Sequence, residues 1–176
     1  MVLTKIIIPL LSLIFAFNIV NAEKVRATVT SVKGKVEYNE PGSLFPKPLK
    51  SGDKLSSGSI IRTGPGSEVV VAITPGSAIR IDENTVIAIN DMEYSEEGGK
   101  VTARKARIQL SSGTLSSLLD DKTPEVTDFR IETPQGTAAA RGTFYGVSVV
   151  DGQTFVKVQE GKVGFVKNEE PEPEIN

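Results

Sequence analysis

The chain lacks the two residue types that most often carry enzyme chemistry at neutral pH. Its 176 residues include no histidine and no cysteine, which removes the commonest general base, the thiol nucleophile and most ligand sets for transition metals. The densest hydroxyl sites are Ser111-Ser112-Gly113 and Ser116-Ser117. Serines beside glycine in a β-rich sequence are usually turn residues, so we do not expect serine catalysis.

Paired carboxylates are the remaining route to catalysis, because glycosidases need no histidine. Adjacent acidic residues are available at Asp82-Glu83, Glu96-Glu97 and Asp120-Asp121. Neighbouring residues of a strand point to opposite faces, so these pairs do not converge by spacing alone. We interpret them as turn or surface charges, and a carboxylate-based glycan hydrolase is the least favoured of three functional hypotheses.

Calcium is the metal that this composition leaves open. Asp82, Glu83, Asn84 and Asp91 are close in sequence, but they lack the Asp-x-Asp-x-Asp-Gly order that wraps a loop around calcium. We interpret residues 82–84 as a turn between two strands and predict no metal and no cofactor. A calcium site assembled from distant loops stays as the alternative.

The elements that must position these residues are strands. Apolar residues recur with a period near two in Val69 to Ile73, Ile79 to Ile81 and Val86 to Ile89. Sixteen glycines and ten prolines punctuate the chain at short intervals, and no window predicts an amphipathic helix. The pattern predicts an all-β single domain of many short strands, arranged as a β-roll or a solenoid-like sandwich. We interpret Leu115 to Asp121 as an irregular turn after a strand.

An internal echo suggests that the domain has two related halves. Gly34-Lys35-Val36 is answered by Gly113-Thr114-Leu115 and again by Gly161-Lys162-Val163. A second echo matches Thr63 with Thr133 and Gly66 with Gly136. Related β units of this kind would stack and bury one another's apolar faces.

The last third of the chain carries an ordered set of motifs. Thr133-Pro134 is followed by Arg141-Gly142-Thr143 with Phe144, and then by a run ending in Val158, Glu160-Gly161 and Val163. This set resembles the signature of the FecR family, the periplasmic domain of envelope sigma-factor regulators. Earlier segments follow the family's order of strands and turns, namely Gly34 to Val36, Leu49 to Leu55, Ile60 to Gly64, Gly66 to Ile81 and Asn84-Thr85. The resemblance implies a FecR-like β domain that binds or transmits a signal and does not catalyse.

We expect the motif residues to serve the architecture first. They are Thr133, Pro134, Gly136, Arg141, Gly142, Thr143, Phe144, Gly161 and Val163. Gly142 permits a backbone conformation that side chains forbid, and Pro134 marks a strand end or bulge. Arg141 is expected to hydrogen-bond carbonyls or a carboxylate and so to fix a crossing between layers. The alternative is that Arg141 binds an anionic ligand or partner.

Five aromatic residues are expected to supply most of the large apolar bulk of this region: Phe129, Phe144, Tyr145, Phe155 and Phe165. Because Phe144 and Tyr145 are adjacent, one is expected to face inward and the other outward. An exposed Tyr145 would be available for a carbohydrate or protein contact.

The N-terminus predicts export. Lys5 precedes an apolar run from Ile6 to Phe17, and Val20-Asn21-Ala22 fits a cleavage site, so residues 1–22 are interpreted as a secretory signal peptide. The rival interpretation is a retained membrane anchor, but the run is shorter than the roughly 20 residues of a spanning helix. We expect a FecR-like β domain over residues 23–166, an acidic, proline-rich and disordered tail over 167–176, and no membrane span after cleavage.

Charge does not identify the partner. The formal net charge of −2 becomes −3 when Lys5 is lost with the signal peptide. Arg104, Lys105 and Arg107 form the only tight basic group, and on a strand residue 104 faces away from residues 105 and 107, so we do not expect nucleic-acid binding.

Three hypotheses follow for the function. The preferred one is a non-enzymatic, exported protein, periplasmic or secreted, that acts as a binding or scaffold module for an envelope protein or a cell-surface polymer. The second is a signalling component that works with a separate membrane partner; direct contact with a sigma factor is not expected, because the chain leaves no room for the family's flanking domains. The third is the hydrolase. Exposed edge strands would also permit oligomers.

Overall fold

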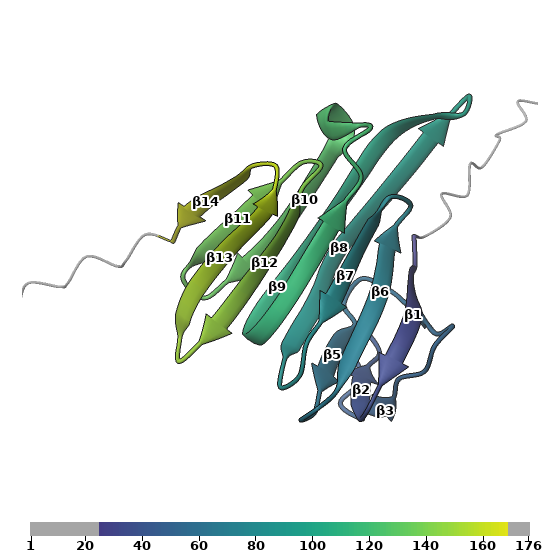
Figure 1. Ribbon diagram of the computed structural model, residues 1–176. Coiled ribbons are helices and arrows are strands. Elements are labelled where there is room, and N and C mark those ends of the chain that lie inside the picture. Colours follow the sequence, from purple (N-terminus) through teal and green to yellow (C-terminus); the bar gives the residue numbers. More distant parts are fainter. Residues whose placement is uncertain (1–24, 169–176) are drawn as a thin grey trace, which may run out of the picture.

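The computed structural model describes residues 25–168 and shows the predicted all-β domain (Figure 1). Its strands form one 14-stranded sheet that folds back on itself into two layers. Between residues 25 and 168 the only helical segment is a 3₁₀ turn, η1 (Pro124–Val126). The signal peptide expected at residues 1–22 and most of the expected tail lie outside the described residues.

We name the two layers A and B. Layer A contains β1 (Ala27–Lys33), β4 (Lys54–Leu55), β6 (Glu68–Thr74), β7 (Ser77–Ile81), the second part of β9 (Lys100–Leu119), β12 (Phe144–Val150) and β13 (Gln153–Glu160). Layer B contains β2 (Val36–Asn39), β3 (Lys47–Pro48), β5 (Ile60–Thr63), β8 (Val86–Glu97), the first part of β9, β10 (Thr127–Thr133), β11 (Gly136–Ala140) and β14 (Val163–Lys167). All pairings are antiparallel except that of β10 with β9, which is parallel.

Apart from a short excursion to β4 in layer A between β3 and β5 of layer B, the chain crosses between the layers at two opposite ends. At the first, which we call the Gly113 end, it crosses after β1, after β5, after β7 and within β9. At the second, the Gly142 end, it crosses after β9, after β11 and after β13. The change of end follows from β9, which pairs with β8 in layer B and then turns to pair with β7 and β12 in layer A.

The core lies between the layers and follows the period of two. In β6, Val69, Val71 and Ile73 are buried, whereas Val70 and Ala72 are half-buried on the outer face. Residues from both layers form one hydrophobic cluster, in which Tyr145 and Phe129 are the largest fully buried side chains. Burial of each large aliphatic side chain contributes about 1.5–3 kcal/mol, so this cluster is the main stabilising feature.

Three crossings use the same local device, a glycine packed against a buried hydroxyl side chain. A Cβ added to Gly34 would lie 2.4 Å from Ser67 Oγ, and one added to Gly113 would lie 2.2 Å from Thr85 Oγ1. A Cβ on Gly161 would lie 2.9 Å from Thr143 Oγ1. These glycines are the three members of the first sequence echo. Gly34 and Gly161 lie between strands where the chain passes from layer A to layer B, whereas Gly113 lies within β9 where it passes from layer B to layer A.

The second sequence echo does not mark equivalent positions. Thr63 ends β5 and precedes a crossing to layer A, whereas Thr133 ends β10 and precedes a hairpin that stays in layer B. The interpretation of Leu115 to Asp121 as an irregular turn is also wrong. Leu115 to Leu119 continue β9, because Gly113 with φ of 89° turns the strand between layers without ending it.

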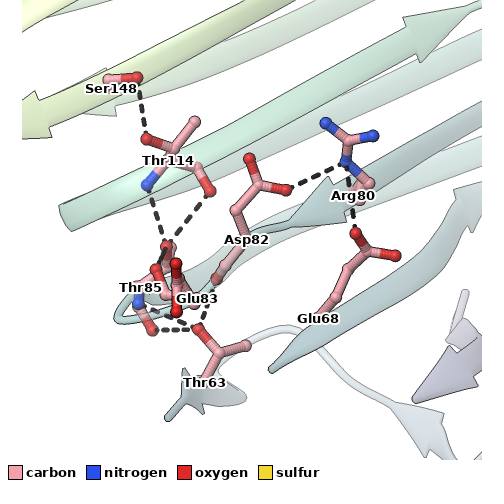
Figure 2. A network of polar contacts seen from close by, with 8 residues as sticks. All are labelled: Thr63, Glu68, Arg80, Asp82, Glu83, Thr85, Thr114 and Ser148. Carbon is pink, nitrogen blue, oxygen red and sulfur yellow. Dashed lines mark hydrogen bonds and ion pairs between the residues drawn. The ribbon is translucent and has the colours of Figure 1, made fainter. Parts of the chain in front are cut away.

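A network of hydroxyl groups joins the crossings at the Gly113 end (Figure 2). Thr85 Oγ1 accepts a hydrogen bond from the Thr114 amide at 2.9 Å, and Thr63 Oγ1 accepts one from the Thr85 amide at 3.0 Å. The Thr63 hydroxyl donates to the Asp82 carbonyl at 2.6 Å. The network therefore satisfies backbone groups that no sheet partner reaches at the crossing.

Thr85→Val is expected to lower the free energy of unfolding by about 1–3 kcal/mol. Valine has nearly the shape of threonine, but it leaves the amide of the half-buried Thr114 without its acceptor on the fully buried Thr85. Thr30→Val is the matched control, because the Thr30 hydroxyl is exposed and donates only to the Val70 carbonyl. Urea denaturation of both variants measures the difference, and equal losses would contradict the role assigned to Thr85.

The domain extends slightly beyond Val166. Lys167 belongs to β14, and the Asn168 amide donates to the Gln135 carbonyl at 2.9 Å. The Asn168 side chain donates to the Pro134 carbonyl at 2.9 Å. These two residues, which the sequence analysis assigns to the tail, are therefore part of the folded sheet.

Candidate functional site

The outer faces of the two layers differ in character. Layer B carries ion pairs of mixed sign along neighbouring strands. They are Lys105–Glu93 at 3.0 Å, Arg107–Glu132 at 3.4 Å and Arg130–Asp128 at 2.9 Å. Hydrogen bonds from Arg130 hold the pKa of Asp128 below its usual range. Exposed pairs of this kind contribute little to stability and are typical of a solvated face.

The outer face of layer A also carries an ion pair, Arg80–Glu68 at 3.9 Å, but towards the Gly142 end it carries a row of mainly small and apolar side chains. Strand register places the following residues side by side across the layer: Thr28, Ala72, Ala78, Leu118, Phe144 and Glu160. Leu118 is 58% exposed, and Phe144 is half-buried beside it. This row forms the floor of a groove of about 830 Å³ at the Gly142 end.

The rim of the groove is mainly acidic. Asp120, Asp121 and Glu160 line it together with a single arginine, Arg26. A floor of apolar side chains with a few charged groups at its margin is typical of a binding site. The groove would therefore suit an apolar segment that carries positive charge.

Gly142 lets two crossings approach each other at this groove. Its φ is 64°, and a Cβ at this position would lie 2.7 Å from the Asp121 Cα. A side chain here would push the 120–126 loop away from the groove, so the expected conformational role of Gly142 agrees with the geometry.

The structure brings some of the predicted motif residues together. Thr143 is buried, donates to the Lys162 carbonyl at 3.2 Å and packs against Gly161, next to Val163. Gly142, Thr143 and Phe144 all line the groove. The motif from Arg141 to Phe144 and the motif around Gly161 thus lie against each other at the Gly142 end.

The remaining motif residues lie at the other end of β10 and β11. Thr133 and Gly136 close the β10–β11 hairpin: the Gly136 amide donates to Thr133 Oγ1 at 3.2 Å, and the Thr133 hydroxyl donates to the Gly136 carbonyl at 2.8 Å. Pro134 occupies the turn itself, in agreement with a strand end. These residues do not take part in the groove.

The expected hydrogen bonds of Arg141 are not formed. The side chain is exposed, and across the described residues its guanidinium has neither a hydrogen bond nor an ion pair. The pKa of Asp128 is lowered mainly by the hydrogen bond from Arg130, against desolvation, which raises it. The positive charge of Arg141 adds a smaller lowering. The crossing is held by Gly142 and Thr143, so the prediction that Arg141 locks it is wrong.

The aromatic residues also differ from expectation. Phe144 and Tyr145 point to opposite faces as predicted, but Tyr145 is the inward one, with 1% of its surface exposed. An exposed Tyr145 contact is therefore excluded. Phe129 is buried as expected, whereas Phe155 is 56% exposed and Phe165 is 37% exposed, because both lie on strands at the edge of the layers.

Sequence reasoning missed Arg104, which is buried beneath the groove. The sequence analysis places Arg104 on the opposite face of the strand from Lys105 and Arg107, and in β9 this face is the inner one. Only 5% of the Arg104 surface is exposed. Its Nη1 lies 3.5 Å from the Asp120 carbonyl, and Gly76 covers the guanidinium. Among residues 25–168, the Arg104 Nε has no hydrogen-bond partner. Arg104 thus fills the space between the layers at the Gly142 end.

Leu118, which the sequence analysis left unassigned, is the other important residue of the site. Its signal was present, because alternation from Leu115 through Ser117 to Leu119 places those residues inside and Leu118 outside. An apolar side chain on the outer face of a strand is a candidate contact residue when it joins a continuous apolar row.

The acidic pairs have structural partners. Asp82 accepts a hydrogen bond from Arg80 (Figure 2). Glu83 accepts one from the Gly66 amide, so the turn at 82–84 is stabilised as a turn. Asp120 accepts a hydrogen bond from the Lys122 amide at 2.9 Å. Within residues 25–168, no cluster of three or more metal-ligating side chains is found.

Comparisons with known proteins agree with the motifs. The family described as FecR protein matches residues 59–164, which is more than half of the chain. No curated protein and no solved structure matches. In the described part of the chain, no helix has the length and apolar character needed to cross a membrane. The matched region contains the groove residues from Ala72 to Glu160 and the complete Arg141 to Val163 motif. The chain therefore belongs to the FecR family.

Proposed function

We propose that this FecR-family chain is an exported, non-enzymatic binding module of the bacterial cell envelope, and that the groove on layer A receives its partner. The FecR family is one of signalling regulators. The observation that carries the proposal is the apolar row on the outer face of layer A, in which Leu118 is exposed and Phe144 is half-buried beside it. The acidic rim favours a protein segment with apolar and basic side chains.

The module acts in the periplasm or after secretion, with residues 1–22 as its signal peptide. Family membership supports a second form of the proposal, in which the module works in signalling with a separate membrane partner. The partner is an envelope protein in both forms. A cell-surface polymer could contact the same floor of the groove, but the acidic rim would not strengthen its binding.

Leu118→Arg is expected to abolish capture of the partner from solubilised cell envelopes. The substitution adds a long positive side chain to the floor of the groove, where it would exclude an apolar segment and repel basic residues. Because Leu118 is 58% exposed, the free energy of unfolding should change by less than about 0.5 kcal/mol.

Leu44→Arg is the matched control. Leu44 is 89% exposed in the loop before β3 and is not part of the groove. Its variant should capture the same proteins as the wild type. Retention of the partner by Leu118→Arg would contradict the proposal, and capture of a glycan without any protein would favour the polymer.

A further inference from the structure

The lateral edges of the two layers are protected unequally. On one side the edges are β3 and β4, which have two residues each and contain Lys47, Pro48 and Lys54. Short edge strands with lysine and proline are a common defence against strand pairing. On the other side the edges are β13 with eight residues and β14 with five, and neither has an outer neighbour among residues 25–168. β13 is therefore the longest available edge of the sheet.

Apolar side chains are exposed along this edge. Phe155 is 56% exposed on the outer face of layer A, and Val158 is 43% exposed on the face that lines the core. Val156 packs only partly against the core, and Phe165 of β14 is 37% exposed. The end of the core between β13 and β14 is thus incompletely covered.

The free backbone groups of β13 can be assigned from one hydrogen bond. The Thr154 amide donates to Gln135 Oε1 at 2.7 Å, so this amide points away from β12. In an antiparallel ladder, alternate residues point to alternate sides. The amides of Val156 and Val158 therefore also point outward, where they can pair with another strand.

We propose that β13 pairs antiparallel with β13 of a second copy of the chain, with Val156 directly opposite Val156. Residues that lie opposite each other in the paired strands must point to the same face, so core-facing residues must pair with core-facing residues. Only registers that differ by two residues meet this condition. Centred on Val156, the pairing sets Phe155 beside Lys157 of the second copy and Thr154 beside Val158. The Thr154 amide then exchanges Gln135 Oε1 for the Val158 carbonyl of the second copy, so the Gln135 side chain moves away from this edge. The lysine stem then covers the exposed ring, and its charge lies near the ring face.

Of the two neighbouring registers, the one centred on Phe155 pairs only residues 153–157 of β13, whereas the register centred on Val156 pairs residues 153–159. The register centred on Lys157 is excluded by charge. Centring the pair on Lys157 would place two lysines directly opposite each other, which destabilises a sheet. The register centred on Val156 has no opposed like charges, because Gln153 lies opposite Gln159. The strand is thus complementary to itself in one register, which is what a two-fold interface between identical strands requires. The proposal does not depend on the groove or on its partner.

The absence of cysteine from the chain permits a direct test of the register. Directly opposite residues of a hydrogen-bonded antiparallel pair have Cα atoms about 5.5 Å apart, within disulfide range. Val156→Cys is therefore expected to give a covalent dimer under mild oxidation. Lys157→Cys is the matched control on the adjacent position, and it should remain largely uncrosslinked because residue 157 lies opposite residue 155. Crosslinking of Lys157→Cys without Val156→Cys would overturn the proposed register.

Sedimentation measurements test the association itself. The wild type is expected to form dimers, and Val156→Pro should raise the dimer dissociation constant at least about tenfold, because each copy loses one outward amide donor. The fold should tolerate proline here, since the Val156 amide makes no bond to β12. A wild type that sediments as a monomer at all accessible concentrations would overturn the proposal, as would dimers unaffected by Val156→Pro in a variant of unchanged melting temperature.

Discussion

Gly113→Ala is expected to lower the free energy of unfolding by on the order of 4 kcal/mol. Two costs add at this position. The φ of Gly113 is 89°, a region that side chains avoid. In addition, the alanine Cβ would lie 2.2 Å from Thr85 Oγ1 and 2.5 Å from the Thr85 Cα. The Thr85 side chain cannot move away easily, because its hydroxyl accepts a hydrogen bond from the Thr114 amide and the residue is fully buried.

Gly66→Ala separates these two costs. Gly66 also has a positive φ, 65°, and lies at the same end of the sandwich, but a Cβ there would meet no atom within 4 Å. Its replacement should cost only about 1–2 kcal/mol of backbone strain. Urea denaturation of both variants gives the two losses. Equal losses would mean that the Gly113 crossing relaxes around a side chain, and the close packing of Gly113 on Thr85 would then not be what closes the two layers.

Gly113 also shows how far sequence reasoning reaches. Alternation and glycine spacing predict the strands, because both are local properties of the chain, and the echo of Gly34, Gly113 and Gly161 identifies three crossings. The role of Gly113 is not local: the strand continues through it, and the constraint comes from Thr85 on another crossing. Local composition after Gly113 therefore suggests a turn and gives no sign that β9 continues into the second layer.

The candidate site can be predicted only in part from the sequence, because some of its features are local and others depend on distant residues. The motif from Arg141 to Phe144 leads to the correct end of the domain, because its glycine and threonine shape the crossing there. The groove floor is assembled from single residues of separate strands, such as Ala72, Ala78 and Leu118, through strand register. Register depends on long-range pairing, and no local pattern specifies it.

Tyr145 is expected to give the fold a distinct loss of stability at alkaline pH. Burial raises the pKa of its phenol far above the usual range. In the unfolded chain a tyrosine ionises near pH 10, so between this value and the raised native pKa the unfolded state binds fewer protons than the native state. The stabilising contribution is fully present below about pH 10, and above it the free energy of unfolding should fall by about 1.4 kcal/mol per pH unit from this group.

Tyr145→Phe should remove this part of the alkaline slope at little cost at pH 7. The Tyr145 and Ser117 hydroxyls lie on paired residues of β12 and β9, and the nearby Ser117 hydroxyl offsets part of the rise in the phenol pKa. Among residues 25–168, however, neither hydroxyl forms a hydrogen bond of ordinary geometry, so phenylalanine should lose little at pH 7. The measurement is the free energy of unfolding by urea from pH 7 to pH 11.5. Tyr38→Phe, which alters a half-buried tyrosine in β2, is the control and should keep the wild-type slope. If wild type and Tyr145→Phe lose stability in parallel above pH 10, the phenol ionises within the native fold, and the core around Tyr145 and Ser117 admits water.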